Sequence, residues 1–211
     1  MKTKQKEYIT QLILLLVAVF FIGVFAAFLV VANIGGDAVL VFEQGFARLL
    51  KIDLGLAILI LNVVLASVVF IIDRKKINVG TVVVAFLLGP FLQLVVNTGW
   101  IYDPMGNIWM AILVDFLAII GLSFSLALYI YANIGLSPFE AIVITIYERT
   151  KWRFALIKMT FDALLFIIGW LLGGVVGVGS IMTVVMLGPL IDLFTSLLKK
   201  TNWVKAPIKV Q

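Results

Sequence analysis

The chain has 211 residues, of which 64% are hydrophobic and 13% are charged, and its formal net charge is +5. Soluble domains are typically about 45–50% apolar and about 25% charged, so this composition excludes a soluble protein and predicts an integral membrane protein. The chain has no cysteine and no histidine. Disulfides, thiol nucleophiles and iron–sulfur clusters are therefore excluded, and the commonest metal ligand and general base are missing. We expect no metal site and no cofactor.

Six stretches are long and apolar enough to cross a bilayer, which takes about 20 mostly apolar residues. The first follows a lysine-rich start, but its apolar run is too long for the h-region of a signal peptide, so we expect a true span. The predicted spans are Tyr8–Val31, Leu54–Ile72, Val79–Thr98, Ile108–Tyr131, Phe154–Leu172 and Val175–Leu198.

An internal repeat links the two halves of the chain. Ala-Asn-Ile-Gly at residues 32–35 returns at residues 132–135, and the apolar segment 80–90, which ends in Gly-Pro, returns at 179–189. Each copy holds three spans, and an odd number forces the second copy to enter the membrane upside down. We therefore predict an all-helical membrane protein with an inverted 3+3 repeat. The predicted copies are residues 8–98 and 108–198, within a single transmembrane bundle of residues 1–211.

The distribution of lysine and arginine predicts the orientation. If the N-terminus is cytoplasmic, 13 of the 16 basic residues fall in cytoplasmic segments, two fall outside and Lys158 lies within a span. Such a bias orients short-loop membrane proteins, so both termini should face the cytoplasm and the protein should lie in the cytoplasmic membrane. Because these residues flank apolar spans, we expect them to set topology rather than to bind nucleic acid.

Each copy contains a segment that is too short and too polar to span, at residues 37–50 and 137–149. Asp37 and Ser137 are good helix N-cap residues, and Pro138 suits the first helical position. Each segment therefore predicts a short helix. It either lies on the bilayer surface or re-enters the bundle with its N-terminal amides facing a cavity that suits an anion.

Gly89-Pro90 and Gly188-Pro189 stand near the middle of the third span of each copy. Proline removes a backbone hydrogen bond and kinks a helix, and in lipid the freed carbonyl needs a neighbour or cavity water. The two kinks indicate either a binding cavity between the halves or ordinary packing.

Four ionisable residues fall inside predicted spans, where a charge is expensive and marks a functional pathway or an internal pair. Lys158 and Asp162 are four residues apart and can pair on one helix face. That pair is either structural or part of a proton relay. Asn62 and Gln93 occupy the first-copy positions of Asp162 and Asp192. The candidates for ion or proton coupling are Asp115, Lys158, Asp162 and Asp192.

These motifs resemble the YitT/YczE group of bacterial membrane proteins, in which an Ala-x-Leu-Gly-x-x-Pro-Trp element precedes a later Gly-Pro-x-Ile-Asp. The first copy departs from the pattern, with Ala38 in place of the proline and Gln93 in place of the aspartate. The resemblance implies a transporter-like membrane protein and names no substrate. The matching residues are Gly135, Pro138, Phe139, Gly188, Pro189, Ile191 and Asp192.

No sequence motif indicates an enzyme. Three functions remain open: a small secondary transporter or exporter, with or without proton coupling through Asp162 or Asp192; a substrate-capture subunit of a larger transporter; or a non-transporting accessory or regulatory protein. The expected partners are the lipid bilayer, an unknown small solute, and a second copy or another membrane protein. The predicted substrate-binding residues are Asn33, Gly35, Gly89, Pro90, Gln93, Asn133, Gly135, Gly188 and Pro189.

Overall fold

The computed structural model describes residues 2–99, 107–150 and 152–200, and all regular structure within these ranges is helical. Six of the helices are long and apolar enough to cross a membrane, which confirms the prediction of six helices of spanning length. The elements are α1 (Lys2–Ala32), α2 (Ala38–Leu50), α3 (Leu54–Asp73), the 3-10 helix η1 (Arg74–Lys76), α4 (Val79–Thr98), α5 (Ile108–Ala132), α6 (Pro138–Thr150), α7 (Phe154–Leu171) and α8 (Val178–Lys199).

The two short helices begin at the predicted residues because side chains there cap the free backbone amides. Asp37 accepts a hydrogen bond from the N–H of Leu40 at 3.3 Å and begins α2. At the start of α6, the N–H of Glu140 donates to Ser137 Oγ and the N–H of Ser137 donates to Glu140 Oε2, both at 3.2 Å. This reciprocal arrangement is a capping box. Pro138 is the first residue of α6.

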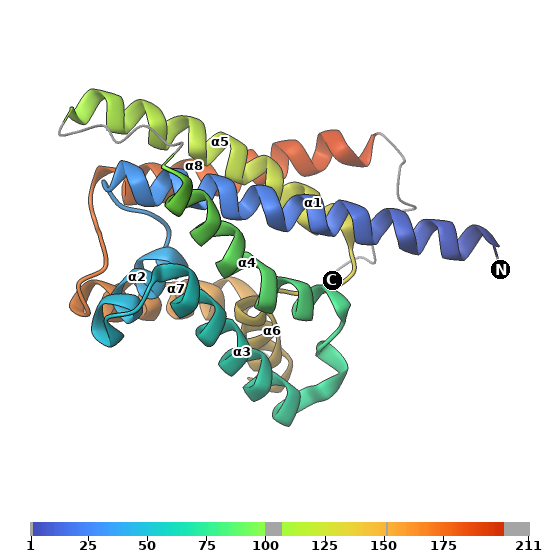
Figure 1. Ribbon diagram of the computed structural model, residues 1–211. Coiled ribbons are helices and arrows are strands. Elements are labelled where there is room, and N and C mark those ends of the chain that lie inside the picture. The colour runs from blue at the N-terminus through green and yellow to red at the C-terminus, as the bar shows by residue number, and fades with distance from the viewer. Residues whose placement is uncertain (1, 100–106, 151, 201–211) are drawn as a thin grey trace.

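The helices form two groups joined by α4 (Figure 1). In one group α1 packs along α5, and α8 packs on the other side of α5; in the second group α2, α3, α6 and α7 pack together. The main core lies where α1, α4 and α5 meet, and it includes Leu15, Ala18, Val84 and Ala127. Small residues such as the two alanines let helices approach closely, as is usual in membranes.

The two halves contact each other through equivalent elements. α2 packs on α7, and its counterpart α6 packs on α3; in the same way, the α1–α4 contact is matched by the α5–α8 contact. One pair breaks the pattern. α3 packs along α4, whereas the described residues of α7 and α8 show no comparable packing. The second half is therefore more open than the first at this pair of helices.

The close approach of α2 to α7 predicts the effect of adding one carbon at Gly169. A Cβ there would lie 2.5 Å from the backbone N and Cα of Phe42, whereas a Cβ on Gly188 would have no neighbour within 4 Å. We expect Gly169→Ala to cost about 1–3 kcal/mol, because overpacking displaces backbone atoms, and to lower the midpoint of thermal unfolding. Gly188→Ala is the matched control and should unfold at or above the wild-type temperature, since alanine favours helix. Equal destabilisation by both variants would contradict the packing of α2 on α7.

Candidate functional site

Asn33 and Asn133, two predicted substrate-binding residues, end α1 and α5. Their φ angles are 53° and 52°, the left-handed conformation that stops a helix and that asparagine tolerates. Gly35 has a φ of 119°, which glycine adopts readily and other residues rarely do. Gly135 lies against Gly80 at the start of α4. These residues shape two turns, and their binding of a solute stays a prediction.

Each turn is seated on the first residues of the last helix of the opposite half. The turn after α1 meets the start of α8, where the N–H of Gly36 donates to Ser180 Oγ at 3.1 Å; we call this the first junction. The turn after α5 meets the start of α4, where Thr81 Oγ1 donates to the carbonyl of Leu136 at 2.8 Å; we call this the second junction. Thr81 and Ser180 hold equivalent positions in the repeat, so the two junctions are reciprocal.

The two Gly-Pro pairs lie inside helices as predicted, but their surroundings differ. A Cβ on Gly89 would lie 2.2 Å from the carbonyl oxygen of Gly55 in α3. One turn further along α4, Gln93 Oε1 accepts a hydrogen bond from the N–H of Gly55 at 2.9 Å. By contrast, a Cβ on Gly188 would have no neighbour within 4 Å, and Asp192, the counterpart of Gln93, is exposed. The prolines inside α4 and α8 are Pro90 and Pro189.

Four charged side chains gather where α2 packs on α7, and we call Asp37, Glu43, Lys158 and Asp162 the charge cluster. Lys158 Nζ lies 2.7 Å from Asp162 Oδ1, as their spacing of four residues indicates. Glu43 is only 5% exposed and was not among the predicted site residues. Asp37 was expected only as a helix cap. The cluster holds three carboxyl groups and one ammonium group.

Burial alters the pKa of both carboxyls that α2 brings to the cluster. It raises the pKa of Glu43 well above the ordinary value of 4.5, and the nearby Asp37 carboxylate raises it further. Burial also raises the pKa of Asp37 above 3.8; the N–H of Leu40 and the Lys158 ammonium lower it, while Asp162 raises it. Carboxyls with raised pKa values are typical of sites that exchange protons.

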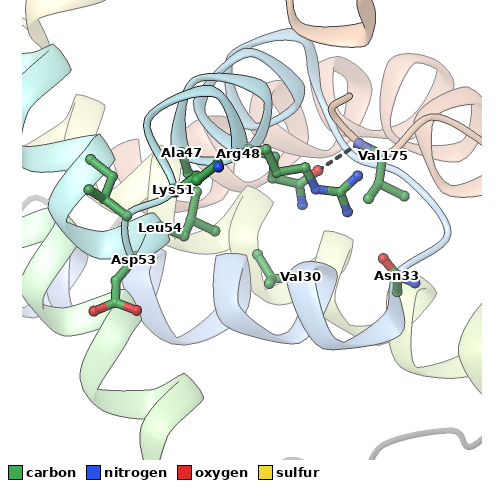
Figure 2. A pocket seen from close by; sticks show the side chains of 10 residues that line it. Val30, Asn33, Ala47, Arg48, Lys51, Asp53, Leu54 and Val175 are labelled. Carbon is green, nitrogen blue, oxygen red and sulfur yellow. Dashed lines mark hydrogen bonds between the residues drawn. The ribbon is translucent and has the colours of Figure 1, made fainter. Parts of the chain in front are cut away.

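A cavity of about 350 Å³ opens between the end of α1 and the last turn of α2 (Figure 2). Asn33 lies on one side of it, and Arg48 and Lys51 lie on the other. Arg48 also donates a hydrogen bond to the carbonyl of Gly173, just beyond the end of α7. Apolar and polar residues line the cavity together, and its charged side chains are Arg48, Lys51 and Asp53. Neither Gly-Pro pair belongs to its lining, although the two kinks predicted a cavity between them.

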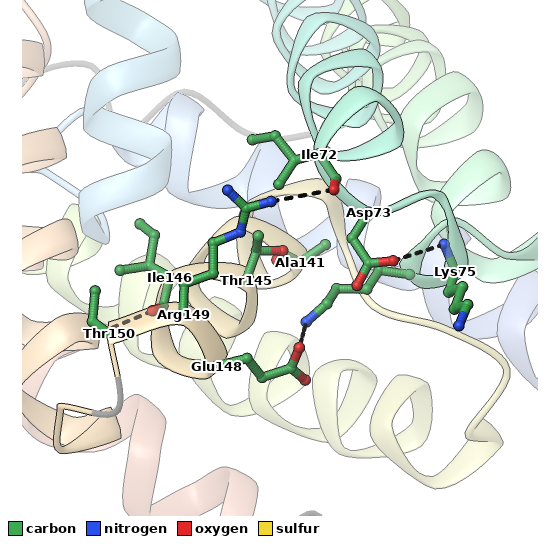
Figure 3. Close-up of polar contacts among 10 residues, drawn as sticks. Ile72, Asp73, Lys75, Ala141, Thr145, Ile146, Glu148, Arg149 and Thr150 are labelled. Atoms are coloured by element: carbon green, nitrogen blue, oxygen red, sulfur yellow. Dashed lines mark hydrogen bonds and ion pairs between the residues drawn. The ribbon is translucent and has the colours of Figure 1, made fainter.

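Arg149 makes the corresponding contact in the other half. Its Nη2 donates to the carbonyl of Ile72 in the last turn of α3 at 3.3 Å, and Glu148 beside it forms an ion pair with Lys76 of η1 (Figure 3). A cation at the last carbonyls of a helix also interacts favourably with the helix dipole. Arg48 and Arg149 thus fasten each short helix to a spanning helix of the opposite half.

Asp115 does not join the charge cluster. It is fully buried in α5, where neither carboxylate oxygen has a hydrogen-bond partner, and it lies against Gly179 at the start of α8. The four predicted ionisable residues therefore lie in three different places. Lys158 and Asp162 are on α7 in the charge cluster, Asp115 is at the first junction, and Asp192 is exposed on α8.

Residues 9–196 match the family described as "Family of unknown function (DUF6198)". An "Uncharacterized protein" of Haemophilus influenzae is 21% identical over 187 residues, which cover 89% of this chain and 84% of that protein. The "Uncharacterized membrane protein YczE" of Bacillus subtilis is 20% identical over 130 residues, which cover 62% of this chain and 59% of that protein. No solved structure matches the chain.

The raised pKa of Glu43 predicts how stability changes with pH. The folded protein binds the Glu43 proton more tightly than the unfolded chain does, so its stability falls as pH rises above the ordinary pKa of 4.5. Glu43→Gln removes this loss, and we expect it to raise the midpoint of thermal unfolding relative to wild type at about pH 8 but not at about pH 4.

The control for this experiment is Asp53→Asn, because Asp53 is exposed and makes no side-chain cap bond. This variant should follow the wild-type pH profile. If the midpoints of wild type and Glu43→Gln change in parallel over the whole pH range, the raised pKa of Glu43 is contradicted.

Proposed function

The chain belongs to the DUF6198 family, a YczE-like group of bacterial membrane proteins, and from this premise we propose that it is a small-solute secondary transporter of the cytoplasmic membrane. It works by alternating access between two inverted halves. One observation carries the proposal: charged residues are partly exposed on α7 and α8, which, unlike the equivalent α3 and α4, do not pack closely within the described residues.

The exposure of these charges supports a water-filled passage. Lys158 and Asp162 keep 41% and 35% of their side chains exposed, and Asp192 on α8 is exposed as well. A charge in contact with the bilayer centre costs about 2.5–3.5 kcal/mol on insertion scales. Lys158 and Asp162 pair with each other, but their exposed parts, like Asp192, still require water, and a passage beside α7 and α8 supplies it. Asp162 and Asp192 are its proposed proton-coupling residues.

The reciprocal contacts between the halves support the inverted repeat. A two-fold rotation that exchanges the halves carries the α2–α7 contact onto the α6–α3 contact. It also carries Arg48 onto the end of α6, where Arg149 makes the corresponding contact, and it carries the first junction onto the second. This exchange, together with the lysine and arginine distribution, favours an axis in the membrane plane and cytoplasmic termini.

In this orientation the molecule is closed towards the outside and open towards the cytoplasm. The outer ends of α3 and α4 are held together by Gln93 and the N–H of Gly55. The equivalent positions, Ala155 of α7 and Asp192 of α8, belong to helices that are not closely packed. The opposite state exchanges the two arrangements, with α7 closed on α8 and α3 apart from α4.

The burial pattern of α2 favours a re-entrant helix over one on the bilayer surface. An interfacial helix turns its polar side towards water. Here Glu43 and Gln44 are buried against the protein, whereas Leu49 and Leu50 are 57% and 47% exposed. The buried side of α2 thus includes polar residues, and the two exposed leucines of its last turn are suited to lipid.

A second candidate function is an accessory protein or a subunit of a larger transporter. It is favoured by the exposed apolar side of α7 and α8, where Leu171 and Val184 are each 74% exposed. A second copy or another membrane protein would then cover these helices and the charges beside them.

The proposed orientation predicts which introduced cysteines react from outside the cell. Because the chain has no cysteine, one new thiol reports its own position. In intact cells a membrane-impermeant maleimide should label Asp53→Cys, and it should label Lys75→Cys only after permeabilisation; both native residues are exposed. The reverse pattern would overturn the orientation, and labelling of both from one side would show that α3 does not cross the bilayer.

Alternating access predicts two disulfides that exclude each other in one molecule. Gly55→Cys/Gln93→Cys should cross-link in the state described here after a small separation of α3 from α4, because a Cβ on Gly55 would press against that of Gln93 and a disulfide needs about 3.8 Å between the two Cβ atoms. Ala155→Cys/Asp192→Cys should cross-link in the opposite state. Each double variant is oxidised in native membranes, and the linked peptides are identified by mass spectrometry. Gly55→Cys/Asp192→Cys is the control, since α3 and α8 do not pack closely, and it should stay reduced.

A protein that links only the 55/93 pair occupies one state, and this result would favour the accessory function. If linking the 55/93 pair leaves the 155/192 pair able to link in the same molecule, the halves do not alternate. Either result would contradict the proposed transport cycle.

A further inference from the structure

Asp115 is a buried acid without a partner. The residue is 0% exposed, and neither Oδ1 nor Oδ2 has a hydrogen bond to any residue that the structure describes. It also takes part in none of the ion pairs among the described residues. Burying an ionised carboxylate without compensation is costly, so the group requires either a proton or a cation.

Three oxygens from both halves of the chain lie near Gly179: the two carboxylate oxygens of Asp115 and the carbonyl oxygen of Gly35. The position that a Cβ of Gly179 would take is 2.9 Å from Asp115 Oδ1, 3.1 Å from Oδ2 and 3.1 Å from the carbonyl oxygen of Gly35. The three oxygens therefore lie close to one another, and the absence of a side chain at Gly179 avoids a steric clash with them. Its own N–H is already used, because it donates to the carbonyl of Ile34 at 2.9 Å.

The turn after α1 fixes the carbonyl of Gly35 in this place. The φ of Gly35 is 119°, and a Cβ on it would lie only 2.4 Å from Ser180 Oγ. The hydrogen bond from the N–H of Gly36 to Ser180 Oγ holds the next residue. The carbonyl is thus positioned by a glycine-only conformation and by the first turn of α8.

The arrangement suits a monovalent cation better than a proton. A protonated carboxyl donates one hydrogen bond and leaves its second oxygen unsatisfied, whereas a cation can interact with both oxygens of Asp115 and with the Gly35 carbonyl. A single carboxylate balances one positive charge. Divalent calcium sites use six to eight oxygen ligands, often from several carboxylates, and no three acidic side chains among the described residues are placed to hold one metal ion.

We propose that the first junction binds Na⁺ through the carboxylate of Asp115 and the carbonyl of Gly35. Na⁺ there joins the turn of one half to α5 and α8 of the other. Unwound backbone carbonyls beside a helix end are the usual setting for coupling ions in membrane transporters. Binding at this site requires no transport, so it stands apart from the function proposed above.

The repeat supplies an internal comparison for this site. The position equivalent to Asp115 is Leu15, which is 0% exposed in the apolar core. The second junction therefore has no carboxylate at the position of Asp115, and leucine is compatible with the same place in the fold. Asp115→Leu gives the second half the residue that the first half already has.

Thermal unfolding of the purified protein in detergent tests the proposal, with choline chloride holding the ionic strength constant. At about 100 times the dissociation constant, Na⁺ should raise the wild-type midpoint by roughly 5–10 °C. Asp115→Asn and Asp115→Leu should abolish this rise, and Gly179→Ala should reduce it by crowding the oxygens. Asp53→Asn is the control, because this exposed carboxyl lies at the start of α3 and is not one of the proposed Na⁺ ligands; the variant should respond as wild type does.

Wild-type protein with equal midpoints in Na⁺ and choline would overturn the proposal without any variant. So would a Na⁺ response that survives in Asp115→Asn or Asp115→Leu. Stabilisation by acid alone, lost in Asp115→Asn, would identify a proton site instead and likewise overturn it. If the Asp115 variants fail to fold, the wild-type titration and Gly179→Ala decide the question. The two proposals can fail separately: if the protein binds Na⁺ but the 155/192 pair never links, the Na⁺ site stands and the transport cycle is wrong.

Discussion

The fold depends on how the backbone is satisfied where α1 and α5 end. Inside a bilayer a free N–H or carbonyl finds no water, so another part of the protein must supply its partner. The N–H of Gly36 finds Ser180, and the carbonyl of Leu136 finds Thr81; each partner lies in the opposite half. Neither half completes its own turn. The two copies of the repeat therefore fold as one unit, and their reciprocal contacts follow from this requirement.

The sequence predicts the elements well because their signals are local. Apolar runs predict the six long helices, and Asp37 and Ser137 predict the starts of the short ones. Local sequence signals do not predict which side of α2 is buried. Phe42 and Phe46 suggest a face that turns inward, yet the buried side carries Glu43 and Gln44. In lipid an apolar side can face outward, so hydrophobicity alone does not identify the buried side, and α7, which packs on α2, lies more than 100 residues away.

The candidate site shows the same division between local and distant signals. The pairing of Lys158 with Asp162 follows from their spacing on one helix. Asp37 and Glu43 come near that pair only through the α2–α7 contact, which no sequence motif predicts. Asp115 was recognised as a charge within a span, but its position beside the Gly35 carbonyl required the first junction.

The halves share a scaffold but differ in charge, and this difference bears on the proposed cycle. In the first half the neutral Gln93 binds the N–H of Gly55, so α3 and α4 close without burying a charge. In the second half the equivalent residue is Asp192, which is exposed while α7 and α8 stand apart. Closing these helices would bury a carboxylate, which is costly until a proton or another positive charge neutralises it. The half that carries the carboxylate is therefore the half whose closure depends on an ion, whereas the neutral half closes without one.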